Sequence, residues 1–188
     1  TTYYRGMHTV PREIQLKEGK NGEIILTAYP CAELNSLQNI EASFRNIVVE
    51  DSYNFRNFCK DNNGAIVVDL NAVSEADYYT VTLFNEVGEN VELLFDCINS
   101  SLTVNRGKSG KVDLNEKFIH QWTLPLRTSK TLELSMFLDK SSIECFVNGG
   151  EEVVSFQVYP SQPYNSATIC SHGGPVTINR LETYKITK

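Results

Sequence analysis

Hydrophobic and polar residues alternate along much of this chain, and this period of two limits its fold more than any other feature. In residues 131–138, leucine or methionine occupies every second position, as in a strand with one buried face. Residues 66–70, 79–83 and 91–95 show similar alternation. Clusters of Gly, Asn, Asp and Ser separate these stretches, as turns between strands require. The pattern therefore predicts an all-β protein.

Helical periodicity is missing from every window of 12 residues, and residues 30–39 could form one helical turn at most. Many short strands with regular turns indicate a β-sandwich, a jelly roll or a barrel. Further short strands are expected at residues 22–27, 102–104 and 176–178, and residues 105–110 are expected to form a loop.

A chain of 188 residues is long enough for one domain whose core needs neither disulfides nor metals. Its net charge of -6 disfavours binding to nucleic acid or to anionic membranes, and no run of 18 apolar residues predicts a membrane span. Because the first residue is Thr1 rather than methionine, we expect a processed product or a piece of a longer protein. Residues 1–10 lack a clean period and are expected to form an entry arm or linker, which leaves 11–188 for the β domain.

Glu144 and Cys145 are adjacent on an expected strand and resemble a catalytic acid beside a nucleophilic thiol. Alternation along a strand sends their side chains to opposite faces. No histidine is near Cys145 in the sequence, so nothing there lowers the pKa of its thiol. We therefore expect Cys145 to pack in the core and Glu144 to face solvent, and no catalytic residue is assigned.

The three histidines (His8, His120 and His172) and the five cysteines are scattered, without the spacing of a metal site or a disulfide framework. Neither a metal nor a cofactor is therefore expected.

The chain has 19 aromatic residues, and sugar binding is one function that they suggest. The C–H face of a sugar packs on an exposed aromatic ring. The candidates are Trp122, Tyr159 and Tyr164. Packing within a β-rich protein is the alternative role for each of these rings.

Several motifs, taken in order, resemble a known family. The chain opens with "YYRGMHTVPREIQL" (3–16), followed by "AELNSL" (32–37) and "LTVNRGKSG" (102–110). It continues with "LELSMFLDKSSIECFVNGGEEVVSFQVYP" (132–160) and ends with "INRLETYKI" (178–186). This series covers nearly all of the chain and resembles the C-terminal β-sandwich domain of glycoside hydrolase family 32, the family of invertases, levanases, inulinases and sucrose-6-phosphate hydrolases. The resemblance implies a two-sheet antiparallel β-sandwich, jelly-roll or concanavalin-like, with essentially no helix.

In that family, catalysis belongs to an N-terminal five-bladed β-propeller, with carboxylates in "NDPNG", "RDP" and "EC" motifs. This chain contains neither of the first two, and its single "EC" lies where the family has "VEVF" or a close variant. The resemblance therefore implies a non-catalytic module that supports a propeller of the same polypeptide. The parent enzyme would be a retaining hydrolase of fructosyl bonds in sucrose or fructans. A fructan-binding module and a structural or oligomerising domain, such as a homodimer, are the alternatives.

The resemblance also suggests which residues contact the propeller, all of them in the entry segment. They are Tyr4, Arg5, Met7, Pro11, Arg12 and Glu13. For Arg12 and Glu13, the alternative is that they are ordinary charged residues at the end of a strand. Two compartments are consistent with the sequence: the bacterial cytoplasm, and the periplasm or the exterior of the cell.

Overall fold

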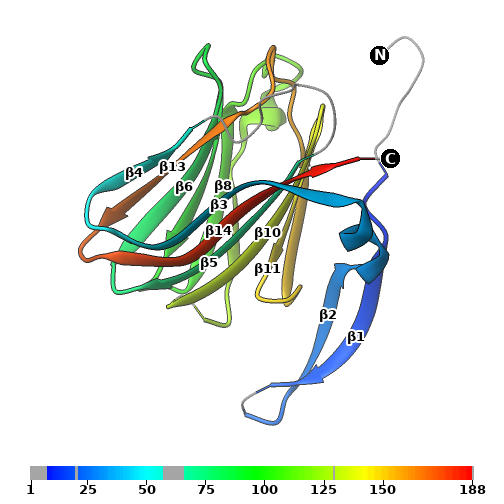
Figure 1. Cartoon of the computed structure of the whole chain (residues 1–188), viewed down its shortest axis with the longest axis vertical. Coiled ribbons are helices and arrows are strands. Elements are labelled where there is room, and N and C mark those ends of the chain that lie inside the picture. The colour runs from blue at the N-terminus through cyan, green and yellow to red at the C-terminus, as the bar shows by residue number, and fades with distance from the viewer. Residues whose placement is uncertain (1–7, 20, 57–65, 129, 188) are drawn as a thin grey trace.

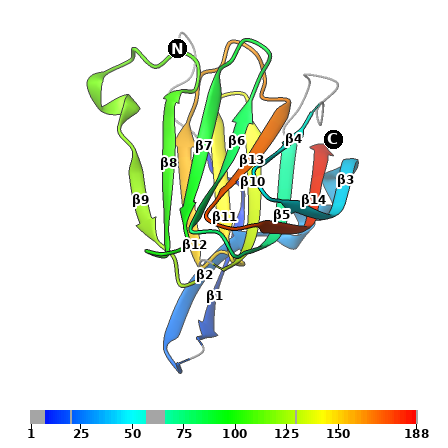
Figure 2. The ribbon, with the colours of Figure 1, turned by 90° about the vertical axis from the view of Figure 1, so that its left-hand side faces the viewer.

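A computed structural model describes residues 8–19, 21–56, 66–128 and 130–187 (Figure 1). Two six-stranded sheets stack face to face (Figure 2), and a third sheet contains only two strands. All of the paired strands are antiparallel. The expected antiparallel β-sandwich is confirmed, and the helix in the described residues is limited to two short 3₁₀ segments, η1 (Ala32–Leu37) and η2 (Glu116–Ile119).

The strands of the first large sheet are, in spatial order, β12 (Glu152–Gln157), β11 (Ser142–Val147), β10 (Thr131–Asp139), β5 (Ile66–Ser74), β14 (Val176–Ile186) and β3 (Gln38–Val49). Those of the second are β4 (Ser52–Phe55), β13 (Ser166–His172), β6 (Tyr78–Phe84), β7 (Asn90–Asp96), β8 (Ser101–Lys108) and β9 (Trp122–Pro125).

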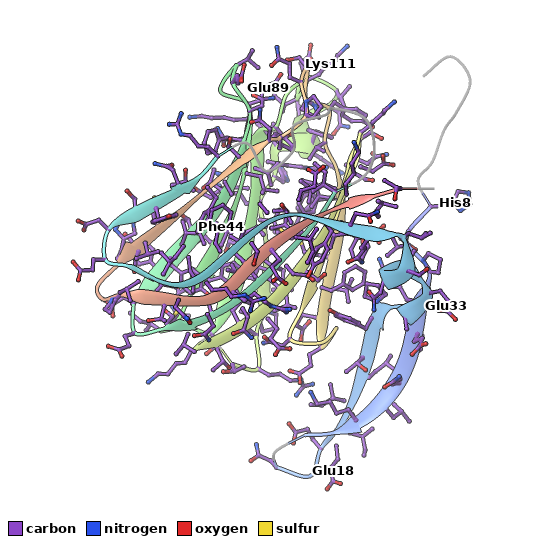
Figure 3. The ribbon with its side chains drawn as sticks, viewed as in Figure 1. His8, Glu18, Glu33, Phe44, Glu89 and Lys111 are labelled. Carbon is purple, nitrogen blue, oxygen red and sulfur yellow. The ribbon has the colours of Figure 1, made fainter. Side chains whose placement is uncertain are left out.

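The third sheet is a hairpin of β1 (Arg12–Glu18) and β2 (Ile24–Pro30). Its base lies beside the first large sheet, and the rest projects away from the sandwich (Figure 1). Figure 3 places Glu18 at the far end of this projection. We call this two-stranded unit the β1–β2 hairpin.

The main core lies between the two large sheets, because each sheet turns one set of alternating side chains toward the other. Every second residue of β6, β7 and β8 is buried. Fully buried large side chains in this layer include Phe55, Leu83, Phe95, Leu134 and Met136. Burial of so many apolar groups is the main force that holds the two sheets together.

A second, smaller core lies on the outer face of the first large sheet. It contains Val67, Phe137 and Phe146, and Val10 and Leu34 pack against it from the segments that flank the hairpin. All six residues of β11 are consequently buried, whichever face they point to. The outer face of this sheet is therefore covered at one end rather than exposed to solvent.

Two expectations about local structure have opposite outcomes. Asn148, Gly149 and Gly150 all have positive φ and turn the chain between β11 and β12, as their sequence predicts. The loop expected at residues 105–110 is wrong over most of its length, because β8 continues to Lys108. Arg106 occupies the third inward position of that strand, where a charged residue breaks the apolar alternation.

Candidate functional site

Glu144 lies where β11 meets the chain segment that precedes the hairpin. The residue is only 4% exposed, so the expectation of a solvent-facing glutamate is wrong. Cys145 does point to the opposite face and is buried in the main core, and this burial raises the pKa of its thiol well above the usual range. Glu144 is buried because the segment around Val10 and Arg12 covers the outer face of β11.

Both carboxylate oxygens of Glu144 accept hydrogen bonds. Oε1 accepts from the backbone N–H of Val10 at 2.8 Å, and Oε2 lies 2.5 Å from Nη2 of Arg12. The same Nη2 donates to Oγ of Ser155 at 2.9 Å, and the guanidinium carbon lies 5.0 Å from the centroid of the Phe146 ring. The arginine thus balances the buried carboxylate and covers an aromatic face. We call these five residues the entry anchor.

The contacts of the entry anchor hold the segment around Val10 and Arg12 against β11. A general acid must present its proton to a substrate atom, whereas Glu144 is engaged by an amide and a guanidinium. A retaining glycosidase also pairs two carboxyl groups about 5 Å apart. The groups that bond to Glu144 are instead those of Val10, Arg12 and Ser155.

Three of the six expected interface residues lie in the described part of the chain. Arg12 belongs to the entry anchor, and the carbonyl of Pro11 accepts from the N–H of Cys31 at 3.0 Å, which closes the base of the hairpin. Glu13 is exposed on β1 and accepts a hydrogen bond from Gln15. Outside the described residues lie Tyr4, Arg5 and Met7.

Further contacts hold the hairpin against the turn between β11 and β12. The N–H of Ala28 donates to the carbonyl of Gly150 at 3.0 Å. Nζ of Lys17 lies 2.6 Å from Oε1 of Glu151, and the ring of Tyr29 packs edge-on against the anchor's phenylalanine at 6.0 Å. Sequence reasoning missed these contacts, which join segments that are far apart in the chain.

Trp122, at the start of β9, is 39% exposed. The guanidinium of Arg106 lies between two rings, 3.9 Å from the centroid of Phe118 and 4.2 Å from that of Trp122. It also donates to the carbonyls of Phe118 and Gln157, each at 2.8 Å. Tyr159 is half-buried, with its ring 5.9 Å from that of Phe118. Both aromatic candidates thus belong to a cluster around one buried arginine.

Tyr164 is not an exposed aromatic platform, because only 4% of the residue is accessible. Its hydroxyl donates to the carbonyl of Ser109 at 2.8 Å, and burial raises its pKa. The residue contributes to one wall of a hollow of about 270 Å³, together with Lys140 and Pro160. Its hydroxyl therefore has an internal partner, as buried tyrosines normally require.

A polar hollow of about 100 Å³ lies on the outer face of the first large sheet, between that sheet and β2. Its walls include Tyr29, Asp69, Glu133, Ser135 and Arg180. Oδ1 of Asp69 accepts from Oγ of Ser135 at 2.5 Å, and burial raises the pKa of this carboxyl group. Alternating polar residues on β5 and β10 are the only sequence signal for this hollow.

No three His, Cys, Asp or Glu side chains come together as a metal site in the described residues. Of the histidines, His172 stacks on Tyr78 with ring centroids 4.5 Å apart, and His8 and His120 are exposed. Within the same ranges, no helix has the length and apolar character needed to cross a membrane.

Comparisons with known proteins find relatives that are named levanase and exo-inulinase. Levanase of Bacillus subtilis (strain 168) is 24% identical over 195 residues, which cover 100% of this chain and 28% of the levanase. The extracellular exo-inulinase of Aspergillus awamori is 31% identical over 125 residues, or 63% of this chain and 23% of that protein. The crystal structure of the Aspergillus awamori exo-inulinase has a TM-score of 0.80 at 25% identity, covering 96% of this chain and 36% of that one.

The β-fructofuranosidase of Schwanniomyces occidentalis has a TM-score of 0.72 at 12% identity over 96% of this chain and 40% of that one, and this likeness shows the fold alone. The chain spans less than a third of the length of the levanase and the exo-inulinase. Residues 31–185 match the family model described as "Glycosyl hydrolases family 32 C terminal". With most of its length covered by this match, the chain belongs to glycoside hydrolase family 32, as a C-terminal domain of that family.

Proposed function

We propose that this chain is the non-catalytic sandwich module of a β-fructosidase and supports a catalytic five-bladed β-propeller that precedes it in the same polypeptide. The parent enzyme would hydrolyse fructosyl bonds in sucrose or fructans. The names of the levanase and exo-inulinase relatives support this proposal, as does the small share of their length that the chain spans.

The entry anchor is the observation that carries the proposal. It fixes the N-terminal side of the chain, at Val10 and Arg12, to a strand of the sandwich through Glu144. A module that supports a preceding domain needs such a joint, because a flexible linker would leave the two domains free to move. A catalytic role for Glu144 would require a free carboxyl group, and the anchor engages both of its oxygens.

The purified chain should release no fructose from sucrose, levan or inulin under conditions in which the complete polypeptide does. In that polypeptide, Glu144→Gln should leave kcat within about twofold, measured at a temperature where the variant stays folded. Ser155→Ala is a matched control at the same contact. Fructose release by the purified chain that disappears in Glu144→Gln would contradict the proposal.

We propose fructan binding at Trp122 as a second candidate function, because this ring is partly exposed and Arg106 covers one of its faces. An indole held in place in this way loses little freedom when a sugar packs on its other face. Tyr159 belongs to the same cluster through Phe118.

The single tryptophan of the chain allows a direct test of this second function. Titration with inulin or levan oligosaccharides should change the Trp122 fluorescence saturably, and maltose oligosaccharides should not. Calorimetry of Trp122→Phe then provides the matched control, with binding expected to fall at least about tenfold. No heat and no fluorescence change with either fructan would reject fructan binding and leave the supporting role alone.

A further inference from the structure

The outer face of the second large sheet carries small polar side chains and almost no charge. Every second residue of β6, β7, β8 and β13 is buried, and the residues between them face outward and are mostly half-buried. At the centre of the sheet, these outward residues are Thr80, Thr82, Glu92, Leu94, Thr103, Asn105, Thr168 and Cys170. We call this set the threonine face.

Low charge distinguishes the threonine face from the outer face of the first large sheet. Glu92 is the single charged residue of the threonine face. The other sheet presents a cluster of charges on its outer face, made of Asp69, Glu182, Arg45 and Arg180. In a chain with 21% charged residues, four adjacent strands with one charge form a surface that does not depend on ionic contacts. The ligand that such a surface fits is uncharged.

The strand register arranges the threonine face in two rows across the sheet. One row contains Thr168, Thr82, Glu92 and Asn105, and the other contains Cys170, Thr80, Leu94 and Thr103. Each row has a side chain about every 4.8 Å, which is the distance between neighbouring strands. Hydrogen bonds extend the rows to the edge strands, from Thr168 to Asn54 at 2.5 Å and between Thr103 and Thr123 at 2.8 Å. Hydroxyl and amide groups thus cross the whole width of the sheet.

Polar groups at the centre of the threonine face have hydrogen-bonding capacity left. In the part of the chain that the structure describes, the hydroxyls of Thr80 and Thr82 have no protein partner, and the Glu92 carboxylate has no ion pair. A threonine hydroxyl donates one hydrogen bond and accepts two, and a carboxylate accepts through both oxygens. Sugar hydroxyls also donate and accept, so a saccharide matches both kinds of group.

Apolar groups on the same face suit the C–H groups of a sugar. Leu94 lies between Thr80 and Thr103 in its row. Tyr78 shares the outward face of β6 and is 42% exposed, and its ring stacks on that of His172 with the centroids 4.5 Å apart. Sugars pack their C–H faces on exposed aromatic rings, and a ring held by a neighbour loses little freedom on binding.

The threonine face lies on the opposite side of the sandwich from the entry anchor. The anchor covers the outer face of the first large sheet at β11, whereas the threonine face belongs to the second sheet, which is in front in Figure 2. In that view, no other strand of the described chain crosses in front of β6, β7 and β8. A domain joined through the entry anchor therefore leaves the threonine face accessible.

We propose that the threonine face binds a fructan chain that lies across the strands, which would keep the enzyme on the polymer between cleavages. The choice of fructan rests on the proposed function. A second copy of this chain is disfavoured as the occupant, because packing two such faces together would bury Glu92 without a cation. The face also lacks the arginine and aromatic residues that anchor most protein interfaces.

Affinity electrophoresis of the purified chain tests this proposal, with levan, inulin or dextran in the gel. Single contacts on an open face are weak, so binding should add up along a polymer. Levan or inulin should slow the migration of the chain saturably, and dextran, an uncharged polymer of another sugar, should not. No retardation by either fructan would overturn the proposal, and equal retardation by dextran would overturn the choice of fructan.

Substitution of two threonines tests the assignment to this face. Thr80→Val combined with Thr82→Val removes two hydroxyls, keeps the shape of both side chains and suits a strand. Levan binding should weaken about tenfold, as the loss of two neutral hydrogen bonds implies. Thr177→Val is the matched control, because Thr177 is half-buried on the outer face of the other large sheet. Undiminished binding by the double variant would contradict the proposal.

Amide chemical shifts locate the contact without any substitution. Titration of the chain with levan oligosaccharides should move the amide signals of Thr82 and Thr103 and leave that of Thr177 unchanged. Shifts confined to Phe118 and Trp122 would assign the sugar to the aromatic cluster around Arg106 and overturn this inference.

The outcomes separate this inference from the proposed function. Levan binding at the threonine face of a complete polypeptide that releases no fructose would support the binding site and reject the fructosidase. Fructose release by a complete polypeptide that levan does not retard would do the reverse.

Discussion

Replacing Arg12 with alanine should lower the free energy of unfolding of this chain by about 3 kcal/mol, the lower end of the cost of breaking a buried ion pair. The Glu144 side chain is 5% exposed and would stay buried without its cation, while the Arg12 side chain is 22% exposed. Phe146 and Ser155 would lose a partner in the same variant. Urea denaturation followed by far-UV circular dichroism measures the change.

Lys17→Ala is the control, because it removes a second ion pair between the hairpin and the sandwich, one that is more exposed than the pair of Arg12 and Glu144. The Lys17 side chain is 54% exposed, and surface pairs of this kind contribute less than about 1 kcal/mol. In a double-mutant cycle, Glu144→Ala should cost much less in the Arg12→Ala background than in the natural chain. Equal effects of Arg12→Ala and Lys17→Ala would show that the entry anchor is no stronger than a surface contact.

The strands that could be predicted from the sequence are those with one apolar and one polar face. β6, β7 and β10 satisfy this condition, and their alternation locates them within a few residues. β3 does not, because it lies at the edge of its sheet and most of its residues are at least partly exposed. Few positions of an edge strand need an apolar residue, so the sequence of such a strand shows little alternation between apolar and polar residues.

The remaining errors arise where distant segments meet. Strand alternation correctly separates Glu144 from Cys145, but it cannot show that Val10, 134 positions earlier, covers the outer face of β11. Phe146 is the residue from which this covering could have been predicted. Its side chain lies on the same face as that of Glu144, and a large aromatic side chain indicates that the face is covered. The burial of Arg106 depends likewise on Trp122, which lies on the next strand.

The position of the hairpin depends on its contact with the turn between β11 and β12. Substitutions at the two adjacent glycines of that turn separate the effect of this contact from the effect of backbone strain. Gly149 and Gly150 both have positive φ, at 69° and 80°. A Cβ on Gly149 would meet nothing within 4 Å, whereas one on Gly150 would lie 2.2 Å from the carbonyl oxygen of Ala28. That oxygen belongs to the backbone of β2 and cannot rotate away as a side chain would. An alanine at Gly150 therefore requires the hairpin itself to move.

Gly150→Ala should thus destabilise the chain by roughly 3 kcal/mol, as the sum of left-handed backbone strain and steric overlap. Gly149→Ala should cost only about 1 kcal/mol, because strain alone applies. Chemical denaturation measures both values.

Exchange at the amide of Ala28, which donates to the carbonyl of Gly150, distinguishes the two variants locally. It should accelerate in Gly150→Ala and stay unchanged in Gly149→Ala. A similar loss of stability in both variants, with the Ala28 amide still protected, would show that the turn tolerates the added methyl group without moving β2.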